Sequence, residues 1–345
     1  MVQHNSGNYF VTGGAGFIGS NFVYRLLERG EKVTIYDNLS RAGAPRNLKW
    51  LQDRFGAHAF NLVVGDVRDP GQLVVSARQA DVIVHLAGQV AVTTSVVKPR
   101  EDFEINAFGT FNVLEAARLN ERNPVFLYSS TNKVYGGMDD VKVVENGLRW
   151  EYEGLPYGAP ETQPLDFHSP YGCSKGTGDQ YVRDYHRIYG LRSVVLRQSC
   201  IYGPRQFGVE DQGWVAWMII AAQTGKPISI YGDGKQIRDL LYVQDLLDAY
   251  DAAIQNIDRI QGQVFNLGGG SENTMSIWTE FGPRLEKLLG KPISVSHGDW
   301  RPGDQKVFVA DIRKAQQMLD WKPKYSVEMG VKALFDWVSA NRELF

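Results

Sequence analysis

Tyr171 and Lys175 are one helical turn apart, and they are the side chains of this sequence best suited to acid–base chemistry. Residues four apart share one face of a helix. A tyrosine titrates near ~10, so it takes a proton from a hydroxyl group at neutral pH only if its pKa falls by roughly two to three units. A neighbouring ammonium group can lower that pKa. The same spacing also occurs on ordinary exposed helices, so the catalytic interpretation depends on the rest of the chain.

The N-terminal region combines a short strand, a glycine-rich turn and a helix. The predicted strand is Asn8–Thr12, the glycines of the turn are Gly13, Gly16 and Gly19, and the helical pattern runs to Arg29. Gly13 permits the tight turn, and Gly16 lets the backbone approach a pyrophosphate at the helix N-terminus. Gly19 lets the helix lie close to the sheet. This pattern predicts a dinucleotide cofactor.

A carboxylate follows the second predicted strand, residues 32–36. Asp37 lies about 20 residues after the glycine turn, where it can accept hydrogen bonds from both ribose hydroxyls of an adenosine. This favours NAD. Arg41 and Arg46 follow closely and could instead hold the 2′-phosphate of NADP, so NADP stays open as the alternative.

Composition limits the classes of protein that the chain can represent. With 345 residues and a formal net charge of −2, it can form a large domain and a smaller one, and no basic segment indicates nucleic-acid binding. The polar N-terminus and the short apolar stretch 214–222 predict a cytoplasmic protein that does not bind a membrane. Cys173 and Cys200 lack metal-ligand spacing, so neither a metal site nor a disulfide is expected.

Further strand-like segments alternate with helical ones as far as residue 197. They are residues 61–64, 82–85, 125–129 and 193–197. The alternation predicts the α/β fold class, with a doubly wound parallel Rossmann sheet. Binding sites in such sheets lie at the carboxyl ends of the strands. The polar residues expected there are Asp66, Gln89 beside Gly88, and residues 129–133.

Beyond residue 197 the pattern becomes irregular, which predicts a smaller substrate-binding lobe interleaved with the sheet domain. The expected NAD-binding domain is residues 1–197 plus roughly 235–268, and the expected lobe is roughly 198–234 and 269–345. Residues 238–245 are expected to begin a long amphipathic helix, and residues 263–267 a strand that could rejoin the main sheet. The insertion 137–170 is too long for a simple connection and could shape one wall of the site.

Together these motifs resemble the extended short-chain dehydrogenase/reductase family. The residues that carry the resemblance are 12–19, 37–41, 85–88, 128–131, 171–175 and 238–245, and it extends over nearly the whole chain. Four more segments are similar to the CDP-paratose/CDP-tyvelose 2-epimerase branch of that family. They are residues 129–136, 165–176, 202–207 and 211–214. The resemblance implies an isomerase, an NAD-dependent nucleotide-sugar epimerase.

The resemblance also implies a catalytic triad of Thr131, Tyr171 and Lys175. Thr131 would hydrogen-bond the reacting sugar oxygen, and Tyr171 would exchange its proton. Lys175 would hold the nicotinamide ribose and lower the pKa of the phenol. The residues implied to bind the cofactor are Gly13, Gly16, Phe17, Ile18, Gly19, Asp37, Asn38, Ser40, Arg41, Asp66, Val67, Leu86, Ala87, Gly88, Asn106, Ser129, Tyr171 and Lys175. Thr131 could instead cap a turn at a strand end, and Asp66 could cap the next helix.

The residues implied to bind the substrate are Gln89, Thr131, Asn132, Lys133, Arg205, Gln206, Arg238 and Arg301. The three arginines are the expected diphosphate anchors, because guanidinium groups bind phosphate oxygens in a bidentate manner. Related 4,6-dehydratases carry Asp-Glu after the threonine, since elimination of water needs another acid and base. Asn132 and Lys133 stand there in this chain, which favours redox epimerisation, although the two could also form an ordinary turn.

The implied reaction is transient oxidation of the sugar at C2, rotation of the ketose and re-reduction, with tightly bound NAD regenerated in each cycle. The substrate pair would be CDP-paratose/CDP-tyvelose, with CDP-glucose/CDP-mannose as the alternative pair. The assignments of C2 as the reacting carbon and of CDP as the nucleotide rest on resemblance alone. A UDP-sugar 4-epimerase is therefore the alternative, and a non-catalytic NAD-sensing protein is a weaker one. Relatives commonly dimerise through a four-helix bundle, to which residues 105–119 and 171–188 would contribute. A homodimer or homotetramer is therefore expected.

Overall fold

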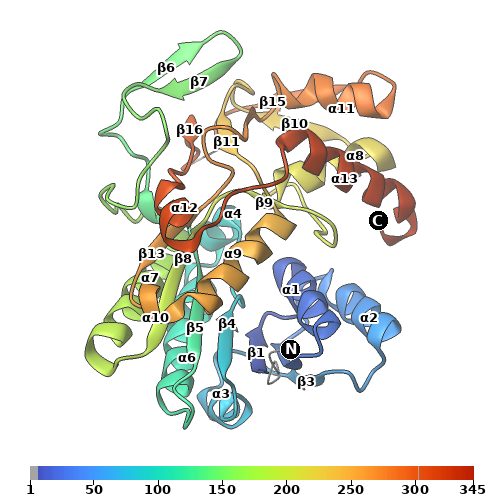
Figure 1. Cartoon of the computed structure of the whole chain (residues 1–345). Helices are drawn as coiled ribbons and strands as arrows, with labels where there is room; N and C mark the ends of the chain where they lie inside the picture. Colours follow the sequence, from blue (N-terminus) through green and yellow to red (C-terminus); the bar gives the residue numbers. More distant parts are fainter. Residues whose placement is uncertain (1–6, 302) are drawn as a thin grey trace. The chain divides into compact units, whose positions relative to one another are not determined.

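The computed structural model describes residues 7–301 and 303–345, and its central element is a seven-stranded sheet (Figure 1). The strands are β1 (Asn8–Thr12), β2 (Lys32–Asp37), β3 (Asn61–Val64), β4 (Val82–His85), β5 (Val125–Thr131), β8 (Arg192–Gln198) and β13 (Val264–Leu267). Their order is β13-β8-β5-β4-β1-β2-β3. β1 pairs in parallel with both β2 and β4, and the chain proceeds outward from β1 in both directions. The predicted doubly wound sheet is confirmed.

Two expectations of the sequence fall outside the described residues. The first is the polar N-terminal segment, of which only Gly7 is described. The second is Pro302, which follows the expected substrate residue Arg301. Within the described ranges, no helix is long and apolar enough to cross a membrane.

The chain forms two compact units, each assembled from three segments. The first contains residues 1–130, 170–196 and 250–264, and the second contains residues 131–169, 197–249 and 265–345. This division differs from the expected one, because residues 131–169 and 235–249 cluster with the second unit. The reason is that these two stretches contain strands whose partners also lie in the second unit.

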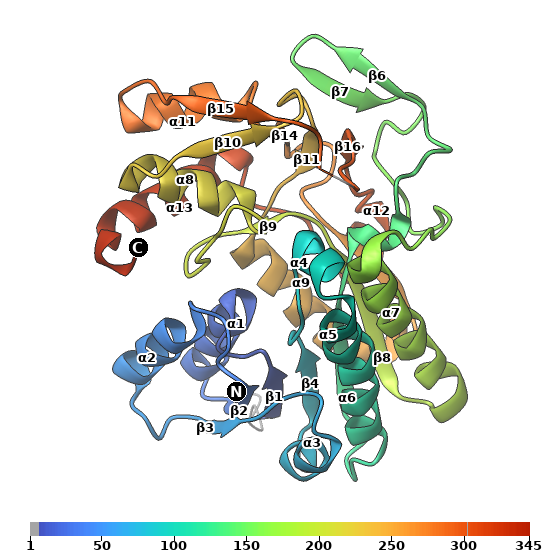
Figure 2. The ribbon, with the colours of Figure 1, turned by 180° about the vertical axis from the view of Figure 1, so that it is seen from behind.

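Helices cover the sheet of the first unit. They are α1 (Phe17–Glu28), α2 (Ala44–Phe55), α3 (Pro70–Ala77), α4 (Val92–Val97), α5 (Pro99–Phe103), the π-helical turn Glu104–Phe108, α6 (Gly109–Arg118), most of α7 (Ser169–Tyr189), the end of α9 (Val243–Gln255) and α10 (Ile257–Ile260). Figure 2 shows α6 and α7 side by side, and the Tyr185 hydroxyl on α7 donates to Glu115 on α6 at 2.7 Å.

Each face of this sheet has its own helical layer, because successive residues of a strand point to opposite faces. Phe10 of β1 belongs to a core cluster with residues of α3, α6 and α7. Its neighbour Tyr9 contacts Phe22 of α1, with ring centroids 6.2 Å apart. Phe22 in turn contacts Tyr250 of α9 at 5.6 Å. The α1 layer therefore lies on the face opposite to α3, α6 and α7.

The second unit is made of short strands and helices around its own apolar core. Its strands are the hairpin β6 (Val143–Asn146) and β7 (Arg149–Tyr152), the parallel pairs β9 (Ile201–Tyr202) with β12 (Leu241–Tyr242) and β10 (Ile228–Tyr231) with β15 (Val295–Gly298), and the sheet β14 (Thr274–Ser276), β11 (Ile237–Asp239) and β16 (Val307–Phe308). Its helices are α8 (Trp214–Thr224), α11 (Phe281–Leu289), α12 (Arg313–Leu319), α13 (Val327–Ala340) and the 3-10 turns Asn132–Tyr135 and Arg342–Leu344. α8, α11 and α13 contribute to one core cluster.

The prediction of a helix that begins at residue 238 is wrong. Residues 237–242 form β11 and β12, and helix α9 begins at Val243. Asp239 in this segment is fully buried and accepts hydrogen bonds from the Ser199 hydroxyl at 2.6 Å and from the main-chain N–H groups of Ala310 and Gly270. Burial raises its pKa to about 6. Pairing with distant strands has overridden the local helical pattern.

Candidate active site

The glycine turn between β1 and α1 has no room for a side chain at two of its glycines. Gly13 has a φ of +69°, and a Cβ there would lie 2.7 Å from the main-chain nitrogen of Ala87. A Cβ on Gly19 would lie 2.1 Å from the Gly13 carbonyl oxygen. Among the described residues, a Cβ on Gly16 would meet only that same oxygen, at 3.1 Å. The backbone at Gly16 is thus open beside the N-terminus of α1, as binding of a pyrophosphate requires.

Asp37 ends β2 and is fixed by the main chain. Its Oδ2 accepts a hydrogen bond from the N–H of Ala15 at 3.0 Å, and its Oδ1 accepts one from the N–H of Leu39 at 2.8 Å. Burial raises its pKa, and these two hydrogen bonds oppose that effect. Each oxygen keeps a further lone pair, so the carboxylate can still accept the ribose hydroxyls of a dinucleotide.

Asp66 is held by a side-chain network at the end of β3. Arg68 donates to both carboxylate oxygens, at 2.9 and 2.8 Å, and Asn38 donates at 3.0 Å. The hydrogen bonds from Arg68 hold the pKa of Asp66 well below its usual range. The helix cap of α3 is Asp69, which accepts the N–H of Gln72 at 3.1 Å. Asp66 is therefore not the cap of that helix.

A chain of buried polar groups supports the turn after β4. Thr12 Oγ1 accepts hydrogen bonds from the N–H groups of Leu86 and Ala87, at 3.2 and 3.3 Å, so its own proton is directed to His85 Nδ1 at 2.7 Å. His85 Nε2 then carries the ring proton and donates to Thr110 Oγ1 at 3.0 Å. Burial lowers the pKa of His85 to about 3, so the ring is neutral. This chain fixes residues 86–88 beside the glycine turn.

Tyr171 and Lys175 lie in the first two turns of α7, and both are buried, with 9% and 7% of their surfaces exposed. The Lys175 ammonium donates to the carbonyl oxygen of Ser129 at 2.5 Å and lies 4.4 Å from the ring centroid of Tyr128. Burial lowers the pKa of Lys175 to about 8. The alternative of an ordinary exposed helix turn is therefore wrong, and the ammonium is held at the end of β5.

Thr131 ends β5 and begins the second unit. Its Oγ1 accepts the N–H of Lys133 at 3.2 Å, and so it caps the 3-10 turn Asn132–Tyr135. Its proton points toward Asn132 Oδ1 at 3.4 Å. The capping role considered from the sequence is thus present. The hydroxyl retains a second lone pair for another partner.

Lys133 and Arg238 form a pair of cationic side chains in the second unit, of which Arg238 is buried and Lys133 is half-buried. The Lys133 ammonium donates to the Gly303 carbonyl oxygen and to Gln305 Oε1, both at 3.3 Å. Arg238 lies 3.4 Å from Asp304 and is 7% exposed. Burial and, to a smaller extent, the charge of Arg238 lower the pKa of Lys133 to about 8, while the charge of Asp304 opposes both. Two cations that face a single carboxylate leave an excess of positive charge, which favours an anionic ligand.

The other expected substrate residues have different neighbours. The Arg205 guanidinium lies 5.5 Å from the ring centroid of Trp337, and that of Arg301 lies 3.8 Å from the ring centroid of Tyr231. Arg301 also lies 3.3 Å from a carboxylate oxygen of Asp211. The buried Gln206 side chain donates to the Ile201 carbonyl oxygen at 3.3 Å. Trp214 and Trp217 pack against the core of this unit.

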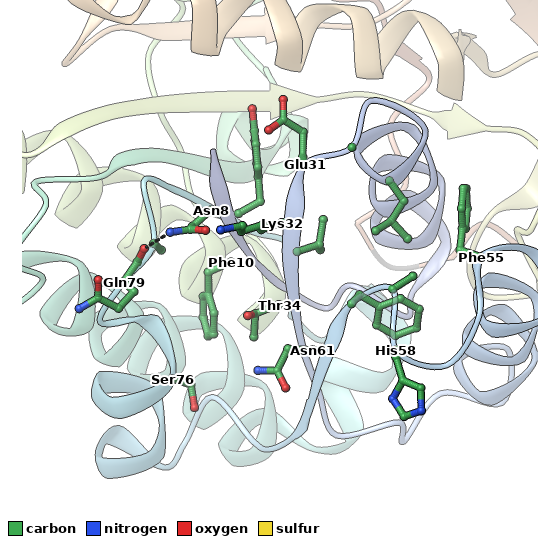
Figure 3. A pocket seen from close by; sticks show the side chains of 17 residues that line it. Asn8, Phe10, Glu31, Lys32, Thr34, Phe55, His58, Asn61, Ser76 and Gln79 are labelled. Atoms are coloured by element: carbon green, nitrogen blue, oxygen red, sulfur yellow. Dashed lines mark hydrogen bonds between the residues drawn. The ribbon is translucent and has the colours of Figure 1, made fainter. Parts of the chain in front are cut away.

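A cavity of about 770 Å³ lies elsewhere on the first unit (Figure 3). Its lining includes Asn8, Lys32 and Asn61, which are the first residues of β1, β2 and β3. It therefore lies at the amino edge of the sheet, whereas the glycine turn, Asp37 and Lys175 lie at the carboxyl edge. None of the expected site residues lines it in the described part of the chain. We do not assign it to the active site.

Among the described residues, no group of three or more His, Cys, Asp or Glu side chains could hold an ion. Cys173 and Cys200 are not joined in a disulfide. Sequence reasoning did not single out Asp102, Ser174 and Thr110 as site residues, although all three are buried polar side chains close to the expected ones. Ser174 lies between Tyr171 and Lys175 in the sequence, and this position is the feature by which it could have been identified as a site residue.

The fold and the residues at the carboxyl edge of the sheet define an NAD-dependent enzyme of the short-chain dehydrogenase/reductase type. The family model described as GDP-mannose 4,6 dehydratase matches residues 10–334, and the chain belongs to this family.

Three similar proteins were compared with the chain. CDP-paratose 2-epimerase of Salmonella typhi is 44% identical, and the match covers 96% of this chain and 98% of that protein. The structure of UDP-glucose 4-epimerase from Thermotoga maritima with UDP-glucose has a TM-score of 0.82 at 29% identity, covering 97% of this chain and 99% of that one. A dTDP-glucose 4,6-dehydratase from Streptomyces venezuelae, with NAD bound, has a TM-score of 0.84 at 29% identity, and 98% of each chain is covered.

These findings confirm four expectations: the family, the fold class, an isomerase of the nucleotide-sugar epimerase type, and NAD as the cofactor. The residue assignments stay predictions. Residues that fit the dinucleotide are the open backbone at Gly16, the carboxylate of Asp37 and the ammonium of Lys175.

Gly13→Ala is expected to weaken NAD binding by more than about tenfold, because the added Cβ would collide with the Ala87 backbone at a positive φ. Gly30→Ala is the matched control. Gly30 also has a positive φ, 75°, but a Cβ there meets no described atom within 4 Å. Calorimetric titration measures the NAD affinity of each variant, and its melting temperature measures its stability. Together they separate a loss of NAD binding from a loss of folding stability. Equal NAD affinities for both variants would contradict the assigned role of the glycine turn.

Proposed function

We propose that this protein epimerises a CDP-linked sugar at C2, interconverting CDP-paratose and CDP-tyvelose or a closely related pair. The observation that carries the proposal is the buried Lys175 ammonium one turn after Tyr171, held by the carbonyl oxygen at the end of β5. The 44% identity to CDP-paratose 2-epimerase along almost the whole of both chains supports the choice of C2 and of cytosine.

In the proposed reaction, Tyr171 removes the proton of the C2 hydroxyl and later returns it on the other face of the sugar. Lys175 keeps a positive charge beside the phenol, which favours its deprotonated form. Thr131 turns its hydroxyl proton from Asn132 to the reacting oxygen and holds it by donating a hydrogen bond. NAD, when bound, accepts the hydride of the sugar carbon and gives it back. A single acid–base group is sufficient for this sequence of steps.

Asn132 and Lys133 support epimerisation rather than dehydration. Elimination of water requires a general acid and a general base in addition to the tyrosine. The Asn132 side chain is an amide, and the Lys133 ammonium is bound to the carbonyl oxygen of Gly303 and to Gln305. Neither residue offers a carboxylate at this place in the chain.

A UDP-sugar 4-epimerase is the second candidate, and the fold similarity to the Thermotoga maritima UDP-glucose 4-epimerase favours it. The two candidates would use the same triad and differ in the sugar carbon presented to Tyr171. A non-catalytic NAD-binding protein is less well supported, because both Tyr171 and Lys175 are present and buried.

The test is to incubate the purified protein with the CDP-sugar in deuterated water and to follow the C2 proton by NMR. We expect inversion at C2 without entry of deuterium, because the hydride stays on the bound cofactor. Entry of deuterium at C2 would contradict the redox mechanism. If C2 is unchanged and UDP-glucose becomes UDP-galactose, the 4-epimerase replaces the proposal.

We further propose that Arg238 and Lys133 hold the diphosphate of the substrate. Arg238→Ala is expected to weaken nucleotide-sugar binding by roughly ten- to a hundredfold, the loss of one charge-assisted hydrogen-bonded contact. Single-turnover hydride transfer at saturating substrate should change far less. Arg313→Ala is the control in the same unit, because Arg313 is half exposed and pairs with Asp311. An unchanged dissociation constant for Arg238→Ala would exclude the anchor role.

A homodimer is the proposed assembly, formed through helices α5, α6 and α7. Apolar side chains on these helices are exposed in the described chain, among them Phe103, Phe108, Phe111, Tyr181, Ile188 and Tyr189. Burial of such a surface against a second copy would stabilise the pair.

Sedimentation at micromolar concentration should give a dimer, and the Phe111→Glu variant should shift the equilibrium toward the monomer. A monomeric wild-type protein would contradict this proposal.

A further inference from the structure

A buried carboxylate, Asp102, forms the centre of a hydrogen-bonded cluster next to α7. Its side chain lies on α5 and is 1% exposed. Its Oδ2 accepts the Ser174 hydroxyl at 2.5 Å. Its Oδ1 accepts the side-chain amide groups of Gln89 at 3.0 Å and of Asn106 at 3.1 Å. Ser174 directly precedes Lys175 in the sequence, so the cluster reaches the helix that carries the ammonium.

Main-chain N–H groups fix the orientation of both amides. Asn106 Oδ1 accepts the N–H of Gln89 at 2.9 Å, and Gln89 Oε1 accepts the N–H of Ala91. An oxygen must face each of these N–H groups, so the NH2 groups of both side chains face Asp102. Asp102 thus receives donors from Ser174, Gln89 and Asn106. Burial raises its pKa, but these donors favour the ionised form.

The surroundings of Lys175 show what a charged Asp102 would do. The titratable groups that interact with Lys175 or face its neighbourhood are Asp102 on α5, Asp179 and Tyr171 on α7, His85 on β4 and Tyr128 on β5. His85 is neutral, and burial raises the pKa of Tyr128, which therefore keeps its proton. Among the groups described, Asp102 and Asp179 supply the negative charge that favours the ammonium.

The position of Asn106 adds a second function for Asp102. Asn106 lies in the π-helical turn between α5 and α6, where the helical hydrogen bonding is interrupted. Its side chain donates to the carbonyl oxygen of Gln89 and accepts the N–H of the same residue, so it holds the loop that follows Gly88. Asp102 holds the amides of both Asn106 and Gln89. It thereby fixes one rim of the carboxyl edge of the sheet.

We propose that Asp102 is a positioning residue for the reaction: its carboxylate orders the loop after β4 through Gln89 and Asn106, and through Ser174 it places a buried negative charge beside the turn of α7 that carries Lys175. The proposal rests on the proposed role of Lys175 as the cation beside Tyr171. Asp102 does not touch the reacting atoms in this account, so it acts through its neighbours.

The test is direct titration of the Lys175 ammonium by 15N NMR, with the resonance assigned through Lys175→Arg. In the wild type, the pKa of Lys175 is expected near 8, since burial lowers it and the carboxylates oppose that effect. Asp102→Asn removes a negative charge, so it should lower that pKa further, by about one pH unit. Ser174→Ala is the control, because it removes a hydrogen bond and keeps the charge; it should leave the pKa of Lys175 unchanged. Equal values for Asp102→Asn and the wild type would overturn the proposal.

The pH profile of kcat/KM gives the second readout. The ammonium is present below its pKa and lost above it, so activity should fall on the alkaline side. In Asp102→Asn this fall should occur about one pH unit lower. A loss of activity at every pH without a shift of the alkaline fall would show that the charge of Asp102 does not act on Lys175, and would overturn the proposal. The NMR titration needs no substrate, so it decides the role of Asp102 even if the C2 epimerase assay fails.

If Asp102→Asn does not fold, the wild type supplies the measurement. The protonation of Asp102 on acidification can be monitored through its 13C carboxyl resonance. The 15N resonance of Lys175 should shift with the same midpoint, because interacting groups titrate together. No response of the Lys175 resonance at that midpoint would overturn the proposal.

Discussion

The ammonium of Lys175 is buried, and a buried cation is stable only where acceptors and opposite charges replace the water it has lost. The first unit supplies both. A carbonyl oxygen at the end of β5 accepts a hydrogen bond from it, an aromatic face of the same strand lies beside it, and the carboxylates of Asp102 and Asp179 supply negative charge. These groups come from β5, α5 and α7. Packing of α5 and α7 on the parallel sheet is therefore what makes the cation possible.

The sequence predicted the parts of this arrangement that have local causes. The glycines at 13, 16 and 19 and the apolar strands around them are sufficient to predict the turn, the sheet and the cofactor. Lys175 was found through its spacing from Tyr171. Asp102 was not found, because its importance comes from the side chains of Gln89 and Asn106 and from a helix some seventy residues later. No local pattern distinguishes such an acid from one that is exposed on a helix.

Tertiary pairing explains the errors in the second unit. Residues 238–242 carry a helical pattern, yet β11 pairs with β14 and β16, and β12 pairs with β9. Their partners lie far away in the sequence, where a local reading cannot see them. The same pairing shifts the boundary between the compact units. It also buries Asp239 among three donors, and places Arg238 beside Asp304.

The π-helical turn Glu104–Phe108 has a consequence for how this chain responds to a deletion. A turn of this kind amounts to one extra residue in an otherwise regular helix. Deletion of a single residue there would restore the α-helix, because the wide turn holds the extra residue locally and the flanking helices α5 and α6 would keep their faces. Asn106 would then turn away from Gln89 while the rest of the helix stayed intact. A one-codon deletion, which exposed loops tolerate easily, would in this helix detach the loop after β4 while leaving the glycine turn, Tyr171 and Lys175 in the sequence unchanged.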